Sequence, residues 1–144
     1  MKKTNRLFAL FVLATLLIGI FQVSSVDLNT PEGPIIVDDY KSICTMSAST
    51  SIVSNGLATC STLVSTYNFS NAISISLTLQ RSIDGGTWSP LYTWSASGIG
   101  TVAKTGSRYV TSGYYYRCVV NATIRSSSGT FIESAYLVSN TVHY

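Results

Sequence analysis

Few side chains in this sequence could carry out acid–base or nucleophilic chemistry. The only histidine, His143, lies next to the last residue, where a fraying end would not hold it as an oriented base. After Tyr40 the chain has two carboxylates, Asp84 and Glu133, and Asp84 lies in a Gly-Gly turn, where its side chain commonly bonds local backbone. Cys44 as a nucleophile would lack a histidine partner. We therefore predict that the protein is not an enzyme.

Patterns that hold metals and other cofactors are absent from the sequence. No Cys/His set has zinc spacing, no acidic loop suits calcium, and no glycine-rich loop could cradle a phosphate group. A glycosidase needs two carboxylates that converge across a sugar, and only chance folding would bring Asp84 and Glu133 together in that way. We expect no cofactor and no metal site.

Aromatic residues are better candidates for function, through binding. Trp88, Tyr92 and Trp94 alternate along one expected strand and would share a face. On another expected strand, Tyr115 and Arg117 would both point outward. A row of aromatic rings could stack on the apolar C–H faces of sugars or anchor a protein partner. The alternative is that the first three cover the core, because a domain this small needs its aromatic residues inside.

The elements that must position these residues are expected to be β-strands. The longest alternation covers 113–125, where the even-numbered residues would face a core. A second covers 72–81, with isoleucine and leucine on one face and polar residues on the other. Pro90 places the strand 88–95 at a sheet edge, because proline cannot donate to the ladder. The other expected strands are 35–37 at an edge, 43–53 with Cys44, Met46 and Ala48 on one face, 57–67, 99–104 and 130–144, with 105–112 as a loop.

These strands define the expected fold class. Turn signals at Asn55-Gly56 and Asp84-Gly85-Gly86 separate the expected strands. No segment after the signal peptide has the periodicity of a helix. About seven short strands in about 100 residues predict an all-β, antiparallel β-sandwich, with a small barrel as the main rival.

The segment Tyr116-Arg117-Cys118 resembles the Tyr-x-Cys motif on the sixth strand of immunoglobulin-like domains. There the tyrosine packs at a corner and the cysteine bridges the two sheets. Cys60 lies 58 residues earlier on an apparent second strand, so the resemblance implies a Cys60–Cys118 disulfide and an immunoglobulin-like sandwich. No tryptophan follows Cys60 on the third strand, which departs from antibody-type domains. Pairing of Cys44 with either partner, or no bridge at all, remains open.

A second resemblance is carried by short motifs spread over residues 42–144. They are Ala58-Thr59-Cys60, Ser76-Leu77-Thr78-Leu79-Gln80-Arg81, Gly86-Thr87-Trp88, Gly113-Tyr114-Tyr115-Tyr116-Arg117 and Ser139-Asn140-Thr141-Val142. With these motifs the chain resembles a family of small secreted proteins from Gram-positive bacteria whose function is unassigned. The motifs are mostly structural, so the resemblance implies a bacterial source and the sandwich fold but no chemistry.

The N-terminus has the layout of a secretory signal peptide. Basic residues precede an apolar run from Leu7 to Phe21, and small residues follow up to Ser25. We expect a signal peptide helix in 1–25 that is cleaved after Ser25, a flexible acidic lead-in in 26–40 and the sandwich domain in 41–144. Retention of the signal as a membrane anchor is the alternative, although a run of fifteen residues, with Thr15 the one polar member, is short for a span.

The charge balance bears on partners. From Lys41 onward there are six basic and two acidic residues, so this part has a net charge of +4. That mild positive charge suits weak attraction to anionic surfaces, but it is too small to indicate a nucleic-acid-binding surface.

We therefore predict a secreted, extracellular, non-enzymatic module. It would bind a cell-wall polymer or another extracellular protein, with no nucleic-acid partner and no membrane contact after signal cleavage. The alternatives are a carbohydrate-binding module that uses the aromatic face, or a small secreted toxin or inhibitor.

Overall fold

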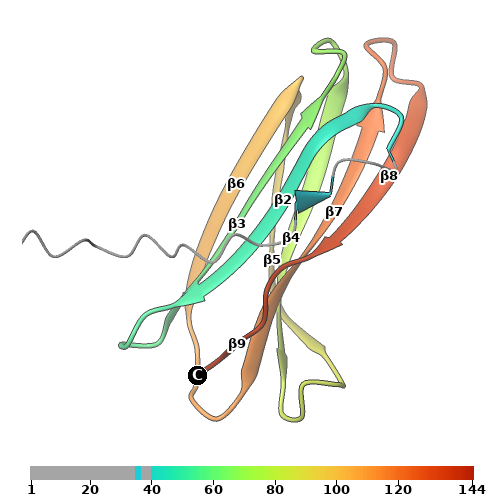
Figure 1. Cartoon of the computed structure of the whole chain (residues 1–144). Helices are drawn as coiled ribbons and strands as arrows, with labels where there is room; N and C mark the ends of the chain where they lie inside the picture. Colours follow the sequence, from blue (N-terminus) through green and yellow to red (C-terminus); the bar gives the residue numbers. More distant parts are fainter. Residues whose placement is uncertain (1–34, 37–39) are drawn as a thin grey trace, which may run out of the picture.

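The computed structural model describes residues 35–36 and 40–144, and these form β-strands without any helix. Two antiparallel sheets pack face to face (Figure 1), which confirms the predicted β-sandwich. The predicted signal peptide (1–25) and most of the lead-in (26–40) lie outside the described residues. The strands are β1 (Ile35–Ile36), β2 (Ile43–Ile52), β3 (Leu57–Thr66), β4 (Ala72–Ser82), β5 (Ser89–Ile99), β6 (Thr101–Tyr109), β7 (Tyr115–Arg125), β8 (Phe131–Val138) and β9 (Val142–His143).

The strand order shows how the chain divides between the layers. The first sheet has the order β1-β2-β3-β6, and the second has the order β5-β4-β7-β8, with β9 also paired to β7. The predicted edge strand at 35–37 is present as β1, which pairs with β2. β5 is an edge strand of the second sheet, as Pro90 predicts.

The chain crosses from the second sheet to the first at Gly100, between β5 and β6. Its φ is +73°, and an added Cβ would lie 2.8 Å from the carbonyl oxygen of Phe69. The Gly100 N–H donates to the Asn71 carbonyl, and the Gly100 carbonyl accepts from the Thr66 N–H, each at 2.9 Å. The crossing therefore requires glycine, both for its backbone conformation and for space.

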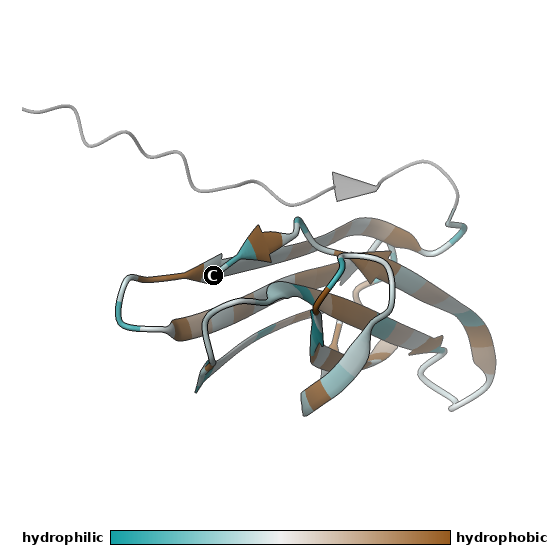
Figure 2. Cartoon of the chain, turned by 90° about the horizontal axis from the view of Figure 1, so that it is seen from below, coloured by the Kyte–Doolittle hydropathy of each residue, from teal (hydrophilic) through white to brown (hydrophobic). Residues whose placement is uncertain are grey.

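The core lies between the facing sides of the sheets, and β7 is its central strand. The even-numbered residues of β7 from Tyr116 to Ile124 are all buried, as the alternation predicts. The inward residues of β4, from Ile73 to Leu79, are equally buried beside them. Apolar and polar bands alternate along the strands in Figure 2.

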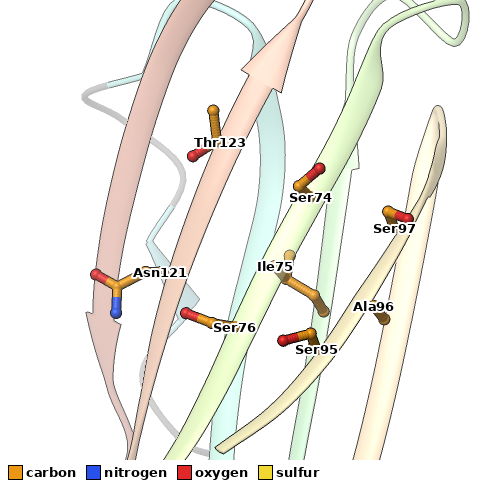
Figure 3. A pocket seen from close by; sticks show the side chains of 8 residues that line it. All are labelled: Ser74, Ile75, Ser76, Ser95, Ala96, Ser97, Asn121 and Thr123. Atoms are coloured by element: carbon orange, nitrogen blue, oxygen red, sulfur yellow. The ribbon is translucent and has the colours of Figure 1, made fainter.

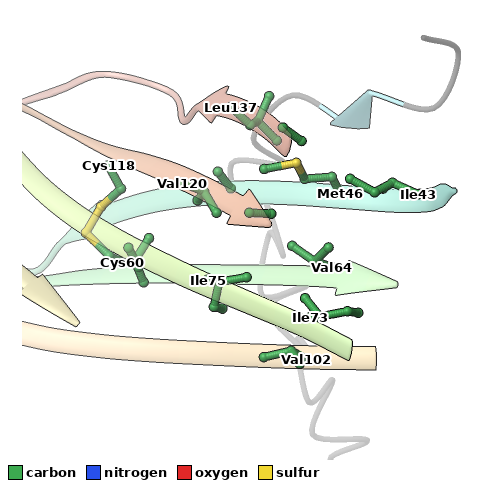
Figure 4. Packing of buried hydrophobic residues seen from close by; sticks show 14 of the residues in the cluster. Ile43, Met46, Cys60, Val64, Ile73, Ile75, Val102, Cys118, Val120 and Leu137 are labelled. Atoms are coloured by element: carbon green, nitrogen blue, oxygen red, sulfur yellow. A yellow bond between two sulfur atoms is a disulfide. The ribbon is translucent and has the colours of Figure 1, made fainter. Parts of the chain in front are cut away.

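The Cys60–Cys118 disulfide joins β3 of the first sheet to β7 of the second, within the buried cluster shown in Figure 4. The two Cα atoms are 6.0 Å apart, and the bridge closes a separation of 58 residues. The pairing implied by the immunoglobulin resemblance is thus confirmed, and Cys44 is a free thiol.

Tyr116 forms the corner that the same resemblance implies. Its ring is fully buried, and its hydroxyl donates a 2.5 Å hydrogen bond to the backbone carbonyl of Thr111. Burial raises the pKa of the Tyr116 phenol, although this hydrogen bond opposes the shift. The two-sheet arrangement, the disulfide between them and this corner make the sandwich immunoglobulin-like.

The predicted end of β6 was wrong. The segment 105–112 was expected to be a loop after a short strand, whereas β6 continues to Tyr109 and pairs along the whole of β3. Gly106, which suggested a break, pairs with Cys60 inside the strand. An added Cβ there would lie 2.2 Å from the Trp94 ring, so the glycine makes room for this side chain.

Two further details differ from the expected pattern. Cys44 does not share the core face with Met46 and Ala48, because a register shift in β2 places it between the pairs Ile43–Thr66 and Thr45–Ser65. Ile43 fills the core instead, and Cys44 is half-buried.

The last strand, expected to be continuous over 130–144, is interrupted after Val138. The Ser139 hydroxyl accepts from the Cys118 N–H and lies 2.7 Å from the Thr50 hydroxyl. The Asn140 side chain exchanges two hydrogen bonds with the Thr50 backbone. This interruption links the second sheet to β2 of the first sheet.

Candidate functional site

The structure separates the three aromatic residues that were predicted to share a face. The register between β4 and β5 shifts at Leu91, because Leu79 pairs with Tyr92 whereas Gln80 pairs with Pro90. A bulge reverses the alternation of side chains on either side of it. Trp88 therefore lies on the opposite side of the sheet from Tyr92.

Tyr92 and Trp94 pack on the core side at the open edge between β5 and β6. Their ring centroids are 4.9 Å apart, and Trp94 lies over Gly106 of β6. The Arg108 guanidinium carbon lies 4.8 Å from the Tyr92 ring centroid. Trp94 packs against the core cluster, which corresponds to the core role that the sequence left open for it, whereas Tyr92 is 43% exposed at the sandwich edge.

Trp88 belongs to a different group, on the outer face of the second sheet. The Arg117 guanidinium carbon lies 4.1 Å from the centroid of the Trp88 ring. The Nε–H of Arg117 donates to the Gln80 side-chain oxygen at 2.9 Å. Tyr115, two residues before Arg117 on the same face, packs edge-on against the His143 ring at 4.5 Å between centroids. The structure therefore brings Trp88 into contact with Arg117 and places Tyr115 on the same face. Tyr92 and Trp94 lie on the other side of the sheet.

An open groove of about 480 Å³ lies on the same outer face, further along β4 and β7. Ile75 and Ala96 contribute to its lining, and the other lining residues carry a hydroxyl or an amide (Figure 3). We call this the hydroxyl groove; its polar residues are Ser74 and Ser76 of β4, Ser95 and Ser97 of β5, and Asn121 and Thr123 of β7.

Sheet pairing places these polar side chains in rows across three strands. Ser76 pairs with Ser95 on one side and with Asn121 on the other. Ser74 pairs in the same way with Ser97 and Thr123. None of the six side chains is charged, and none makes a hydrogen bond to another described residue. The neighbouring hydroxyls of Thr78 and Thr93 on the same face, which do not line the groove, pair with each other at 2.8 Å. The donors and acceptors of the six groove side chains therefore face the groove unpaired.

Sequence reasoning missed the hydroxyl groove, although part of the signal was visible. The alternation in 72–81 correctly placed Ser74 and Ser76 outward. The two other strands that line the groove could not be aligned beside them, because the bulge in β5 and the β4–β7 register are set by tertiary packing.

The two described carboxylates serve separate local hydrogen-bond networks. Asp84 accepts from the N–H groups of Thr87 and Gly86 and from the Ser82 hydroxyl, and these bonds lower its pKa to about 2. They organise the turn between β4 and β5, as the sequence suggests for this carboxylate.

Glu133 of β8 holds the start of β2. Its carboxylate accepts from the N–H groups of Lys41, Ser42 and Ile43 and from the Ser42 hydroxyl, at 2.5–3.0 Å. Burial alone would raise the pKa of Glu133, but these hydrogen bonds outweigh it, and the pKa is lowered. The network ties the second sheet to the first.

Within the described ranges, no cluster of three or more histidine, cysteine or acidic residues could hold a metal ion. No helix in that part of the chain could span a membrane. No protein-family model matches the chain, and no curated protein shows significant similarity to it. The likeness to secreted Gram-positive proteins therefore stays a prediction.

Proposed function

We propose that the protein is a secreted, non-enzymatic binding module that uses the hydroxyl groove to hold a polyhydroxylated polymer of the cell surface. The observation that carries the proposal is the set of six uncharged, unpaired polar side chains around one open groove. Hydroxyl and amide groups in this arrangement can donate and accept hydrogen bonds at once, as the hydroxyls of a sugar require.

The shape of the site suits a chain-like ligand. The groove is lined from three neighbouring strands and is open to solvent, so a polymer could lie along the sheet surface without threading into the fold. Ser76 lies on β4, the middle strand of the groove, and pairs with Asn121 on the neighbouring strand β7, so the two side chains supply a hydroxyl and a carboxamide side by side. A polymer gains affinity by repeating such modest contacts along its length.

Of the aromatic residues that the sequence offered for sugar stacking, the structure leaves fewer candidates. Trp94 lies over Gly106 and is no longer a candidate for sugar stacking. Trp88 lies on the same outer face as the hydroxyl groove but does not line it, and one side of its ring is covered by Arg117. The proposed site therefore depends mainly on hydrogen bonds.

A pull-down on insoluble cell-wall polysaccharide tests the proposal. We expect the wild-type mature chain to be retained, and Ser76→Ala combined with Asn121→Ala to weaken retention about tenfold, because two hydrogen-bonding groups are lost. Ser61→Ala with Thr105→Ala, on the opposite sheet, is the matched control and should bind normally. Retention that is absent, or equal in the groove variant, would contradict the proposal, and capture of a protein fraction instead would favour a protein partner.

A further inference from the structure

We propose that the polymer bound at the hydroxyl groove carries anionic groups, and that Arg117 recognises them as a paired-oxygen subsite beside the groove. This inference rests on the proposed function and adds the chemical class of the ligand. The guanidinium group of Arg117 is held in position from two sides.

Arg117 is oriented by neighbours from two other segments. The Trp88 ring lies under its guanidinium carbon at 4.1 Å, and the Gln80 oxygen accepts from its Nε at 2.9 Å. An arginine held in this way loses little further side-chain freedom when a ligand binds, so its contacts cost less conformational entropy.

The remaining hydrogen-bond donors of Arg117 point to a specific ligand geometry. Its two terminal nitrogens make no hydrogen bond to any described residue. With Nε already bonded to Gln80, the free edge consists of the two Nη groups, and this edge matches the two oxygens of a carboxylate or a phosphate.

No described carboxylate neutralises this arginine. Asp84 is occupied by its own turn and Glu133 by the start of β2, and neither pKa shift has an arginine among its causes. The part of the chain from Lys41 onward carries six basic against two acidic residues. The positive charge at Arg117 is therefore available to an external anion.

The Arg117 subsite and the hydroxyl groove lie along the same strands. Arg117 and Asn121 are both outward residues of β7, and Gln80 and Ser76 are their counterparts on β4. Four residues of extended strand span about 13 Å. One polymer lying along β4 and β7 could thus place its hydroxyls in the groove and an acidic group on Arg117.

Carboxylate and phosphate groups share this recognition chemistry, so the experiment uses three soluble probes. They are polygalacturonate, which carries carboxylates, poly(glycerol phosphate), which carries phosphates, and laminarin, a neutral glucan. Binding to the mature chain is measured by isothermal titration. We expect at least one anionic probe to bind about tenfold more tightly than laminarin, and the better of the two identifies the source of the charge.

Substitutions then assign the preference to Arg117. Arg117→Gln should abolish the preference for the anionic probe, and Arg117→Lys, which keeps the charge but loses the planar fork, should retain only part of it. Arg125→Gln removes an equal charge from the same face of β7, where Arg125 donates to the Gly129 carbonyl, and should leave the preference within about twofold. A melting curve confirms that each variant is folded.

The outcomes separate this inference from the proposed function. If laminarin binds through Ser76 and Asn121 but Arg117→Gln changes nothing, the subsite is wrong and the groove stands. If Arg125→Gln has the same effect as Arg117→Gln, the preference is general electrostatic attraction, and the subsite is also wrong. If no probe binds and cell-wall polysaccharide fails to retain the chain, both proposals fall.

Discussion

The two outer faces of the sandwich have similar compositions but different hydrogen bonding. On the first sheet, serine and threonine side chains of β3 and β6 bond to each other across the strands, in a set that we call the hydroxyl ladder. Its pairs are Thr59–Ser107 at 3.0 Å, Ser61–Thr105 at 3.1 Å and Ser65–Thr101 at 2.8 Å. On the second sheet, Thr78 and Thr93 form one such pair at 2.8 Å between β4 and β5. The six polar side chains of the hydroxyl groove, by contrast, have no partner among the described residues.

Serine and threonine content alone therefore does not define a binding face. Paired hydroxyls stabilise a sheet modestly and offer a ligand little, because their donors are already used. Hydroxyls without a protein partner add little to stability and can exchange their hydrogen bonds to water for bonds to a ligand. Substitutions can separate these two roles, and loss of the bridge between the sheets should damage both faces together.

Removing the bridge between the sheets should have the largest effect on stability. Cys60→Ala with Cys118→Ala opens a loop of 58 residues, and the loss should be about 4 kcal/mol of unfolding free energy in the chain-entropy account. Urea unfolding of the oxidised wild type and the double variant measures the difference. An unchanged midpoint would mean that the core alone holds the two faces in place.

A larger side chain at the open edge of the sandwich, between β5 and β6, should lower the unfolding free energy nearly as much. Gly106→Ala adds a methyl group 2.2 Å from the Trp94 ring, and we expect a loss of about 1–3 kcal/mol in unfolding free energy. Gly86→Ala is the matched control, because an added Cβ there meets its nearest atom at an ordinary 3.6 Å.

A double-mutant cycle identifies the cause at this edge. Trp94→Ala should itself destabilise the protein, and Gly106→Ala should cost much less in that background, because the clash is gone. Equal costs of Gly106→Ala in both backgrounds would show that the ring does not require the glycine.

Acid should weaken the tie between the sheets at Glu133. Its folded-state pKa is lowered, so its contribution is fully present above the ordinary pKa of the carboxyl group, near 4.5, and is lost as pH falls through the lower folded value. Glu133→Gln should therefore show a smaller loss of stability between pH 5 and about 2 than the wild type does. The pKa of Asp84 is about 2, so Asp84→Asn should reduce the loss of stability at the acidic end of this range.

The sequence predicted the fold more completely than the site. Alternation in β4 and β7 identified the inward residues, because one buried face forces a period of two. The Tyr-x-Cys resemblance indicated the pairing of Cys60 with Cys118. The proline at position 90 correctly indicated an edge strand.

The errors share a physical cause, which is that tertiary contacts decided the local structure. Gly106 reads as a loop signal, yet it continues β6 because Trp94 fills the space above it. Bulges at Cys44 and Leu91 changed which residues face the core, and no local pattern marks either bulge. The hydroxyl groove depends on the register of three strands, so its residues could be assigned outward positions only one strand at a time.

The smallest change in stability and the clearest contrast in function should come from matched serines on the two faces. Ser61→Ala breaks a pair of the hydroxyl ladder and should cost about 0.5 kcal/mol of stability without altering binding. Ser76→Ala removes an unpaired hydroxyl and should leave the melting temperature within error. Thermal unfolding of both variants gives the first half of the contrast.

The most direct measurement is the affinity of these two serine variants and the wild type for the same soluble cell-surface polysaccharide, by isothermal titration. We expect Ser76→Ala to weaken binding several-fold, by about 1 kcal/mol, and Ser61→Ala to bind as the wild type does. Equal affinity of all three proteins, or weaker binding by Ser61→Ala alone, would contradict the assignment of the hydroxyl groove as the binding site.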